Sequence, residues 1–437
     1  MGVLDRLKAL RLDLTPARRS RDFRLLVIAG TVFYLGQAIS YVAVPYLIYT
    51  LTGSNTMVGL IGVVELVPLL AAGLWGGALA DHVDRRRMLV GTGLAQVFFT
   101  ALLALNAFAP QPRIWVLFVI APFLVSAGAL QRPSREALLP RTVTHDELPA
   151  ANALNSFGWQ AGNLLGPTIG GILLTTAGAS WCFTVDVVGI AIATVLYLRM
   201  GSYPHREQTT APSLSGIAEG IRYAVSRKDL LGTYLVDIAV MFLAMPIVLF
   251  PALAETIFRQ PHLLGLLYTS ETVGALVASG LSGWHKRIHS YGKVVVVAAA
   301  TYGVFIALAG QAPAFWLCCL ALAAAGAADM TSAVFRMTLW NQSIPETLRG
   351  RLAGIEMLSY SVGPLGAQIR AGYTADTFGV RKAISVGGVA SIVGVVLAAA
   401  ALREFWGYDA RTDAHLLAER ARRAAHGEVL GPDAPPG

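Results

Sequence analysis

Long apolar runs separated by short polar connectors make up most of the chain. They lie at 24–52, 56–80, 88–108, 114–137, 150–177, 180–200, 230–257, 263–284, 293–311, 314–338, 352–375 and 380–402. Each run has about the 20 residues with which a helix crosses a hydrocarbon core roughly 30 Å thick. The runs lack the alternation of polar and apolar residues typical of barrel strands, which indicates helices as the spanning elements. The pattern predicts an all-α membrane protein with twelve transmembrane helices.

Composition agrees with this prediction. Hydrophobic residues make up 55% of the 437 residues and charged residues 14%, and the mean hydropathy is +0.58. Such a chain is too apolar for a large soluble domain. The first 24 residues contain seven Lys/Arg and no apolar run, so we expect an arm rather than a cleaved signal peptide.

Basic residues gather on alternate connectors. The two termini and the connectors after even-numbered spans hold most of the 34 Lys/Arg, whereas the other connectors have only Arg113, Arg259, Arg381 and Lys382. By the positive-inside rule both termini face the cytoplasm, which requires an even number of spans. The net charge of +8 therefore marks orientation in a membrane, and we expect no nucleic-acid partner.

The two halves of the chain repeat each other. A shift of 206 positions aligns Pro45 with Pro251 and Glu65 with Glu271. We divide the chain into a cytoplasmic arm (1–23), a six-helix bundle (24–200), a linker (201–229) with a short amphipathic helix at 213–226, a second six-helix bundle (230–402) and a cytoplasmic tail (403–437).

Two short motifs stand out within this pattern. The connector after the second span contains a G-x-x-x-D sequence and then basic residues, with Gly77, Asp81, Arg85 and Arg86 as its key positions. The fifth span has small residues at close to every fourth position, together with a proline: Gly158, Gly162, Gly166, Pro167, Gly170 and Gly171. Small residues on one helix face let a neighbouring backbone approach closely, and a proline bends the helix. Tight packing alone is one interpretation of this stripe.

The motifs also carry a resemblance. The connector resembles the signature loop of the major facilitator superfamily, and G-x-x-x-G-P-x-x-G-G in the fifth span resembles a motif of its drug/proton antiporter branch. Residues 132–141, 148–153 and 250–254 are similar to segments of bacterial enterobactin exporters and macrolide-efflux proteins in that branch, which implies a bacterial cell membrane. The resemblance implies two pseudo-symmetric bundles with substrate bound between them, and a gating role for the loop. His82 and Asp84 depart from the usual loop residues, Arg and Gly.

Five acids inside predicted spans are candidates for a proton or substrate pathway. They are Glu65, Asp186, Asp237, Glu271 and Asp329. An ionised side chain at the bilayer centre costs at least about 2.5–3.5 kcal/mol on insertion scales, so such acids are functional candidates by default. A carboxyl group kept from water can hold its proton near neutral pH, as a reversible proton carrier must. Glu65 and Glu271 lie deep and at equivalent repeat positions, so we expect both to face a central cavity.

A structural ion pair is the alternative for each acid. It is favoured for Asp186 and Asp237, which lie near helix ends, and Asp329 has Arg336 two turns along its own helix face. In the first span Tyr34, Gln37 and Tyr41 recur at helical spacing and are candidates to line the cavity, although aromatic residues in a span also serve packing.

These observations predict a secondary active transporter that exports an amphiphilic small molecule, drug-like or a siderophore, by proton-coupled alternating access. Its partners are the cargo, protons and the lipid bilayer, and we expect a monomer. An importer, a lysophospholipid flippase, sodium coupling and a non-transporting receptor remain open alternatives. The sequence has no P-loop G-x-x-x-x-G-K and no Ser-His-acid cluster in a polar domain, so we expect neither an enzyme nor a cofactor. The cysteines Cys182, Cys318 and Cys319 fall within spans, where neither a disulfide nor a metal site is expected.

The basic connectors give a first prediction, that position 87 faces the cytoplasm and position 54 the opposite side. Single cysteines placed at Ser54 and Arg87 in a cysteine-free variant should differ in labelling by an impermeant reagent added to intact cells. Ser54→Cys should react and Arg87→Cys should react only after lysis. Labelling of position 87 alone in intact cells would reverse the topology.

Overall fold

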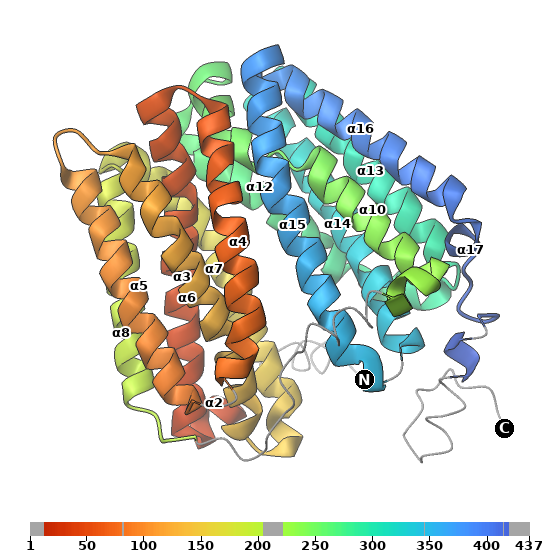
Figure 1. Ribbon diagram of the computed structural model, residues 1–437, viewed down its shortest axis with the longest axis horizontal. Coiled ribbons are helices and arrows are strands. Elements are labelled where there is room, and N and C mark those ends of the chain that lie inside the picture. The colour runs from red at the N-terminus through yellow and green to blue at the C-terminus, as the bar shows by residue number, and fades with distance from the viewer. Residues whose placement is uncertain (1–12, 81–82, 204–221, 345, 414, 419–437) are drawn as a thin grey trace, which may run out of the picture. The chain divides into compact units, whose positions relative to one another are not determined.

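A computed structural model describes residues 13–80, 83–203, 222–344, 346–413 and 415–418 (Figure 1). These residues form helices and no strands. The first half contains the short α2 (Thr15–Arg19) and then α3 (Arg21–Thr52), α4 (Asn55–Ala80), α5 (Arg85–Phe108), α6 (Ile114–Leu138), α7 (Leu148–Thr176) and α8 (Ala179–Leu198). The second half contains α10 (Lys228–Ala244), α11 (Phe250–Ala252), α12 (Leu264–Gly280), α13 (Tyr291–Gln311), α14 (Phe315–Ser343), α15 (Glu346–Phe378), α16 (Val380–Ala401) and the short α17 (Arg403–Trp406).

Most predicted spans match single helices to within a few residues. Among the described residues, ten helical segments are long and apolar enough to cross a membrane. Helices α7 and α15, of 29 and 33 residues, are not among the ten. The all-helical membrane fold is confirmed, and the structure is consistent with twelve spans.

The seventh predicted span, 230–257, is wrong as a single helix. Helix α10 ends at Ala244, and Met245 has an extended backbone with φ −65° and ψ 116°. Pro246 follows, and a proline disfavours the α conformation in the residue before it. The chain resumes with a 3-10 turn at Ile247–Leu249, α11 and a π-helical turn at Leu253–Ile257.

Contacts between residues divide the described chain into two compact units. The first comprises Met1–Ala211 with Phe250–Thr269, and the second comprises Pro212–Leu249 with Ser270–Gly437. Residues 250–269 thus pack with the first unit, where the Tyr46 hydroxyl of α3 donates a hydrogen bond of 2.5 Å to Glu255. The bundles 24–200 and 230–402 stay a prediction as domains. Of the predicted amphipathic helix at 213–226, residues 222–226 are helical and the others lie outside the described residues, as do 1–12 of the arm.

The glycine stripe of α7 packs against α3. A Cβ atom at Gly162 would lie 2.8 Å from the Cβ of Tyr34, and one at Gly170 would lie 3.2 Å from the Ile39 carbonyl oxygen. At Gly171 a Cβ would lie 2.5 Å from the amide nitrogen of Gly265, in α12. The tight-packing interpretation of the stripe is therefore correct for these glycines, since any larger residue would push the helices apart.

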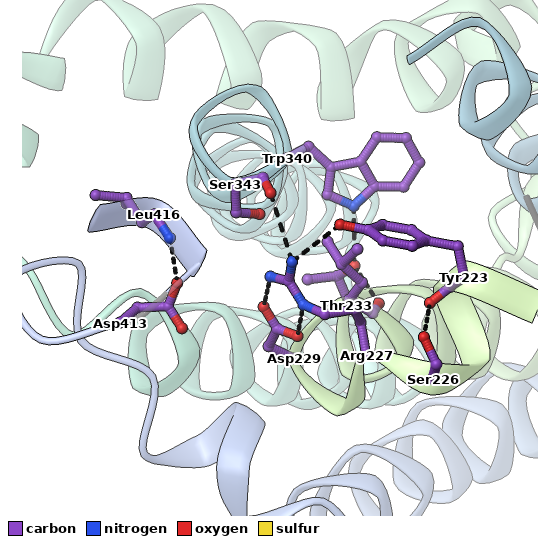
Figure 2. A network of polar contacts seen from close by, with 10 residues as sticks. Tyr223, Ser226, Arg227, Asp229, Thr233, Trp340, Ser343, Asp413 and Leu416 are labelled. Carbon is purple, nitrogen blue, oxygen red and sulfur yellow. Dashed lines mark hydrogen bonds and ion pairs between the residues drawn. The ribbon is translucent and has the colours of Figure 1, made fainter. Parts of the chain in front are cut away.

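The structure describes residues 403–413 and 415–418 of the predicted tail, and this part is folded. Phe405 of α17 is fully buried beside Gly232 of α10 and Gly292 of α13. Next to it, Arg227 forms a bidentate ion pair with Asp229 and donates to the Tyr223 hydroxyl (Figure 2). The C-terminal segment therefore packs against the start of α10 and does not hang free there.

The close crossing of α3 and α7 gives a second prediction. Gly162→Ala should lower the stability of the purified protein by about 1–3 kcal/mol, because the added methyl group overpacks the contact with Tyr34. The matched control is Gly91→Ala in α5, where no atom lies within 4 Å of the new Cβ; alanine should be neutral or stabilising there. Thermal unfolding in detergent measures both. Equal melting temperatures for the two variants would contradict the tight crossing.

Candidate functional site

Three of the five predicted acids lie close together in the second unit, and two of them contact one arginine. Arg336 of α14 forms an ion pair with Asp237 of α10 and reaches within 4.0 Å of Asp329, two turns earlier in its own helix. All three side chains are partly or mostly buried, with exposures of 16%, 17% and 35% for Arg336, Asp237 and Asp329. The ion pair that the sequence left open as an alternative is therefore present, and Asp237 is its closer member.

Glu271 joins this cluster through a close helix crossing. Gly326 of α14 lies directly against the backbone of Glu271 in α12, in a space that no side chain could share. Asp329 follows Gly326 by one turn and interacts electrostatically with Glu271. The Oε1 atom of Glu271 is buried and has no hydrogen-bond partner among the described residues. Tyr302, which is 2% exposed, lies close to both acids.

The two acids of the first unit are held differently. Glu65 is partly buried in the middle of α4 and forms no ion pair with a described residue. Asp186 of α8 is buried, with its Oδ1 atom 2.7 Å from where a Cβ of Gly36 would be. Asp186 therefore occupies a space that exists because α3 has a glycine opposite it. Whether Glu65 and Glu271 face one cavity stays a prediction.

The polar stripe of α3 runs from exposed to buried positions. Gln37 and Tyr41 are exposed, and the Tyr41 ring meets the Tyr268 ring edge-on at 5.9 Å. Tyr34 is half-buried, and its hydroxyl accepts a hydrogen bond from Arg135 of α6. This stripe therefore has two exposed polar side chains, Gln37 and Tyr41, and a third, Tyr34, that is hydrogen-bonded to Arg135.

The predicted gating loop is described only in part. Gly77 lies in the last turns of α4, and Asp81 and His82 lie outside the described residues. Arg85 begins α5, and Arg86 donates hydrogen bonds to the carbonyls of Tyr197 and Leu198 at the end of α8. A basic side chain there offsets the negative end of the helix dipole. Arg86 therefore ties the loop to α8.

Asp84, which departs from the family pattern, caps α5. It accepts hydrogen bonds from the Arg87 amide, the Ser202 hydroxyl and the Tyr203 amide. Partial burial acts to raise the pKa of Asp84, but these bonds outweigh it and hold the pKa below the usual 3.8. The bonds therefore stabilise the folded chain above the usual pKa, and this contribution is lost as the pH falls through the lowered one.

Two charged residues outside the predicted site form polar contacts in the structure. Arg135, near the end of the predicted span 114–137, is buried, with 7% exposure. Its signal in the sequence was a shared helix face with Gln131 and Gly128. Glu255 in the π-helical turn, bonded to Tyr46, had no such signal. Its position depends on the break after α10.

Long apolar helices in which acids and an arginine meet are the features of a membrane transporter. Residues 13–425 match the family described as transmembrane secretion effectors of the major facilitator superfamily. The chain therefore belongs to this family. It is a multi-pass membrane protein, and its family and relatives are transporters, not enzymes. The resemblance to the major facilitator superfamily is confirmed.

Curated relatives and solved structures agree with this assignment. The enterobactin exporter EntS of Escherichia coli O1:K1 is 26% identical over 390 residues, which cover 88% of this chain and 93% of the relative. EntS of Shigella boydii serotype 18 gives the same values. A POT family transporter in complex with 5-aminolevulinic acid superposes with a TM-score of 0.71 at 12% identity, over 88% of this chain and 97% of that chain. A bacterial homolog of the human lysosomal transporter Spinster gives 0.64 at 15% identity, over 93% and 98%. The solved structures show the fold alone.

The ion pair in the second unit gives a third prediction. Arg336→Gln should destabilise the protein by about 3 kcal/mol or more, because it leaves Asp237 buried without its cation. Adding Asp237→Asn should recover part of that loss. Lys228→Gln is the control, since its ion pair with Glu404 is exposed on both sides and should contribute little. Thermal unfolding of these three variants and of the single variant Asp237→Asn is the measurement, and additive losses in the double variant would contradict the pairing.

Proposed function

We propose that this protein exports an amphiphilic small molecule, a siderophore-like or drug-like compound, by alternating access coupled to proton entry. The direction and the cargo class rest on the similarity to EntS, an exporter of enterobactin, over 88% of this chain. Proton coupling rests on the cluster in which Asp237 and Asp329 contact Arg336 and Glu271 interacts with Asp329. We further propose that both termini are cytoplasmic and that the protein works as a monomer.

The charge balance of the cluster is the observation that carries the coupling. Asp237 and Asp329 lie against the Arg336 guanidinium and Glu271 interacts with Asp329, so full ionisation would leave two uncompensated negative charges in a mostly apolar helical unit. A proton on one carboxyl group removes part of this excess. Glu271 is the best site for that proton, because its buried Oε1 atom has no hydrogen-bond partner among the described residues. Asp237 and Asp329 share the arginine and act as its counter-ions.

Glu65 is the second proposed proton site. It lies inside α4 without an ion pair among the described residues, and it matches Glu271 in the sequence repeat. The polar stripe of Tyr34, Gln37 and Tyr41 is proposed to contact cargo. The loop of Gly77, Asp81, Arg85 and Arg86 is proposed to gate access, since a contact made in one state and not in the other shifts the balance between them.

Export against a gradient tests the coupling. Wild type in proteoliposomes should move enterobactin or ethidium uphill when a pH gradient is imposed. Glu271→Gln, alone and with Glu65→Gln, keeps the side-chain shape but fixes the neutral form, so uphill export should fall to background while downhill exchange continues. The matched control is Glu404→Gln, an exposed glutamate outside the spans.

Two results would count against this proposal. A folded double variant that still pumps uphill at the wild-type rate would place the proton path elsewhere, with Asp186, Asp237 and Asp329 as the next candidates. Uphill export that depends on an imposed sodium gradient and not on the pH gradient would show that sodium, not the proton, is the coupling ion.

A further inference from the structure

Arg135 is a buried cation whose charge no described acid balances. It lies in the last turn of α6, is 7% exposed and forms no ion pair among the described residues. The neighbouring Glu136 pairs with Arg132 on the exposed side of the helix, where both side chains are 60% exposed. A buried charge is normally paired, so the missing partner of Arg135 calls for an explanation.

Among the described residues, the surroundings of Arg135 supply rings and hydroxyls but no acidic partner. Its guanidinium carbon lies 4.2 Å from the centre of the Tyr34 ring and 5.9 Å from that of Phe33. One nitrogen donates to the Tyr34 hydroxyl, and the Tyr197 hydroxyl of α8 is also close. These contacts hold the guanidinium in place over the rings but leave its positive charge uncompensated.

Donor capacity is also left over. The second terminal nitrogen of Arg135 is buried and has no hydrogen-bond partner in the part of the chain that the structure describes. One turn earlier on the same helix face, the Nε2 atom of Gln131 is buried and also lacks a partner there. A planar guanidinium with an unused N–H edge is suited to a carboxylate or another oxyanion. The side-chain amide of Gln131, one turn away, can donate a further hydrogen bond to the same anion.

The position of Arg135 connects it to the surface of the first unit. Tyr34, Gln37 and Tyr41 share one face of α3, which is exposed at Gln37 and Tyr41 and half-buried at Tyr34. The Tyr34 hydroxyl, at the buried end of this face, is bonded to Arg135. An amphiphilic molecule lying along this face would bring a polar group at one end to the guanidinium.

The geometry points to an anion-binding site at Arg135 that recognises the carboxylate, or a comparable oxyanion, of an amphiphilic cargo. This inference rests on the proposed export function and narrows its cargo to molecules with a negatively charged group. Arg135 supplies the charge and the N–H edge, and Gln131 supplies a neighbouring donor. Tyr34 and Phe33 orient the guanidinium. Anionic phospholipid offers the same chemistry, but burial of Arg135 among α3, α6 and α8 favours the cargo.

Binding of matched probes tests the site without a pH gradient. We choose 2-naphthoate as the anion and 2-naphthamide as its neutral counterpart of nearly the same shape, measured by calorimetry on the full-length protein in detergent. Wild type should prefer the naphthoate. Arg135→Gln should bind naphthoate about tenfold or more weakly, because it loses a charge-assisted hydrogen bond, and should bind naphthamide as wild type does. Arg132→Gln, an exposed arginine of the same helix, should keep the wild-type preference.

If Arg135→Gln does not fold, Arg135→Lys takes its place in the binding measurement. It retains the charge but lacks the planar fork, so it should weaken naphthoate binding and leave naphthamide binding unchanged. Equal binding of naphthoate by wild type and the tested variant would overturn the site. An equal loss of both probes would show that Arg135 only shapes the surface, and would overturn it too. Tighter binding of dioctanoyl phosphatidylglycerol than of naphthoate, lost in the same variants, would reject cargo in favour of lipid.

The two proposals fail separately. Loss of the naphthoate preference leaves the pH-gradient experiment on Glu65 and Glu271 unaffected. Export that ignores the pH gradient does not alter the calorimetric preference for an anion.

Discussion

A polar side chain in a helix that crosses hydrocarbon has to find its partners on neighbouring helices, because lipid tails offer none. In this protein glycines at close helix crossings make several of these contacts possible. Gly36 leaves the space that Asp186 occupies, and Gly326 lies against the backbone of Glu271 one turn before Asp329. Gly162 lets α7 approach the backbone at Tyr34, whose hydroxyl is bonded to Arg135. The polar groups of the spans thus depend on helix crossings too close for any larger residue.

The two units use their charges in opposite ways. The cluster in the second unit is rich in acid, with Asp237 and Asp329 beside Arg336 and Glu271 next to Asp329. The first unit has Arg135 without a described acidic partner, and Glu65 and Asp186 without an ion pair among the described residues. The two halves share a sequence pattern but differ in how their described charges are paired. The repeat keeps an acid at Glu65 and Glu271, whereas Asp237 and Arg336 align with the uncharged Thr31 and Leu130.

The polar and apolar contacts outside the spans hold the ends of helices in place. Asp84 caps α5 and holds the Ser202–Tyr203 turn, and Arg86 binds the carbonyls at the end of α8. At the other end of the chain, Phe405 is buried against α10 and α13. These contacts close the ends of helices whose backbone groups would otherwise lack partners.

The sequence by itself determined the class of fold, the limits of most spans and the family, because spans of about 20 apolar residues and glycine spacing are local properties. It also singled out the five acids, since a charge in an apolar run is visible without any structure. Only the tertiary structure decided that Asp237 and Asp329 share Arg336, that Glu271 joins them, and that Arg135 is buried without an acid. Those relations join residues up to about a hundred positions apart and follow from which helices cross closely. The break after α10 depended on both. Pro246 is a local signal for a helix end, whereas only the structure shows that residues 250–269 then pack with α3 and α7.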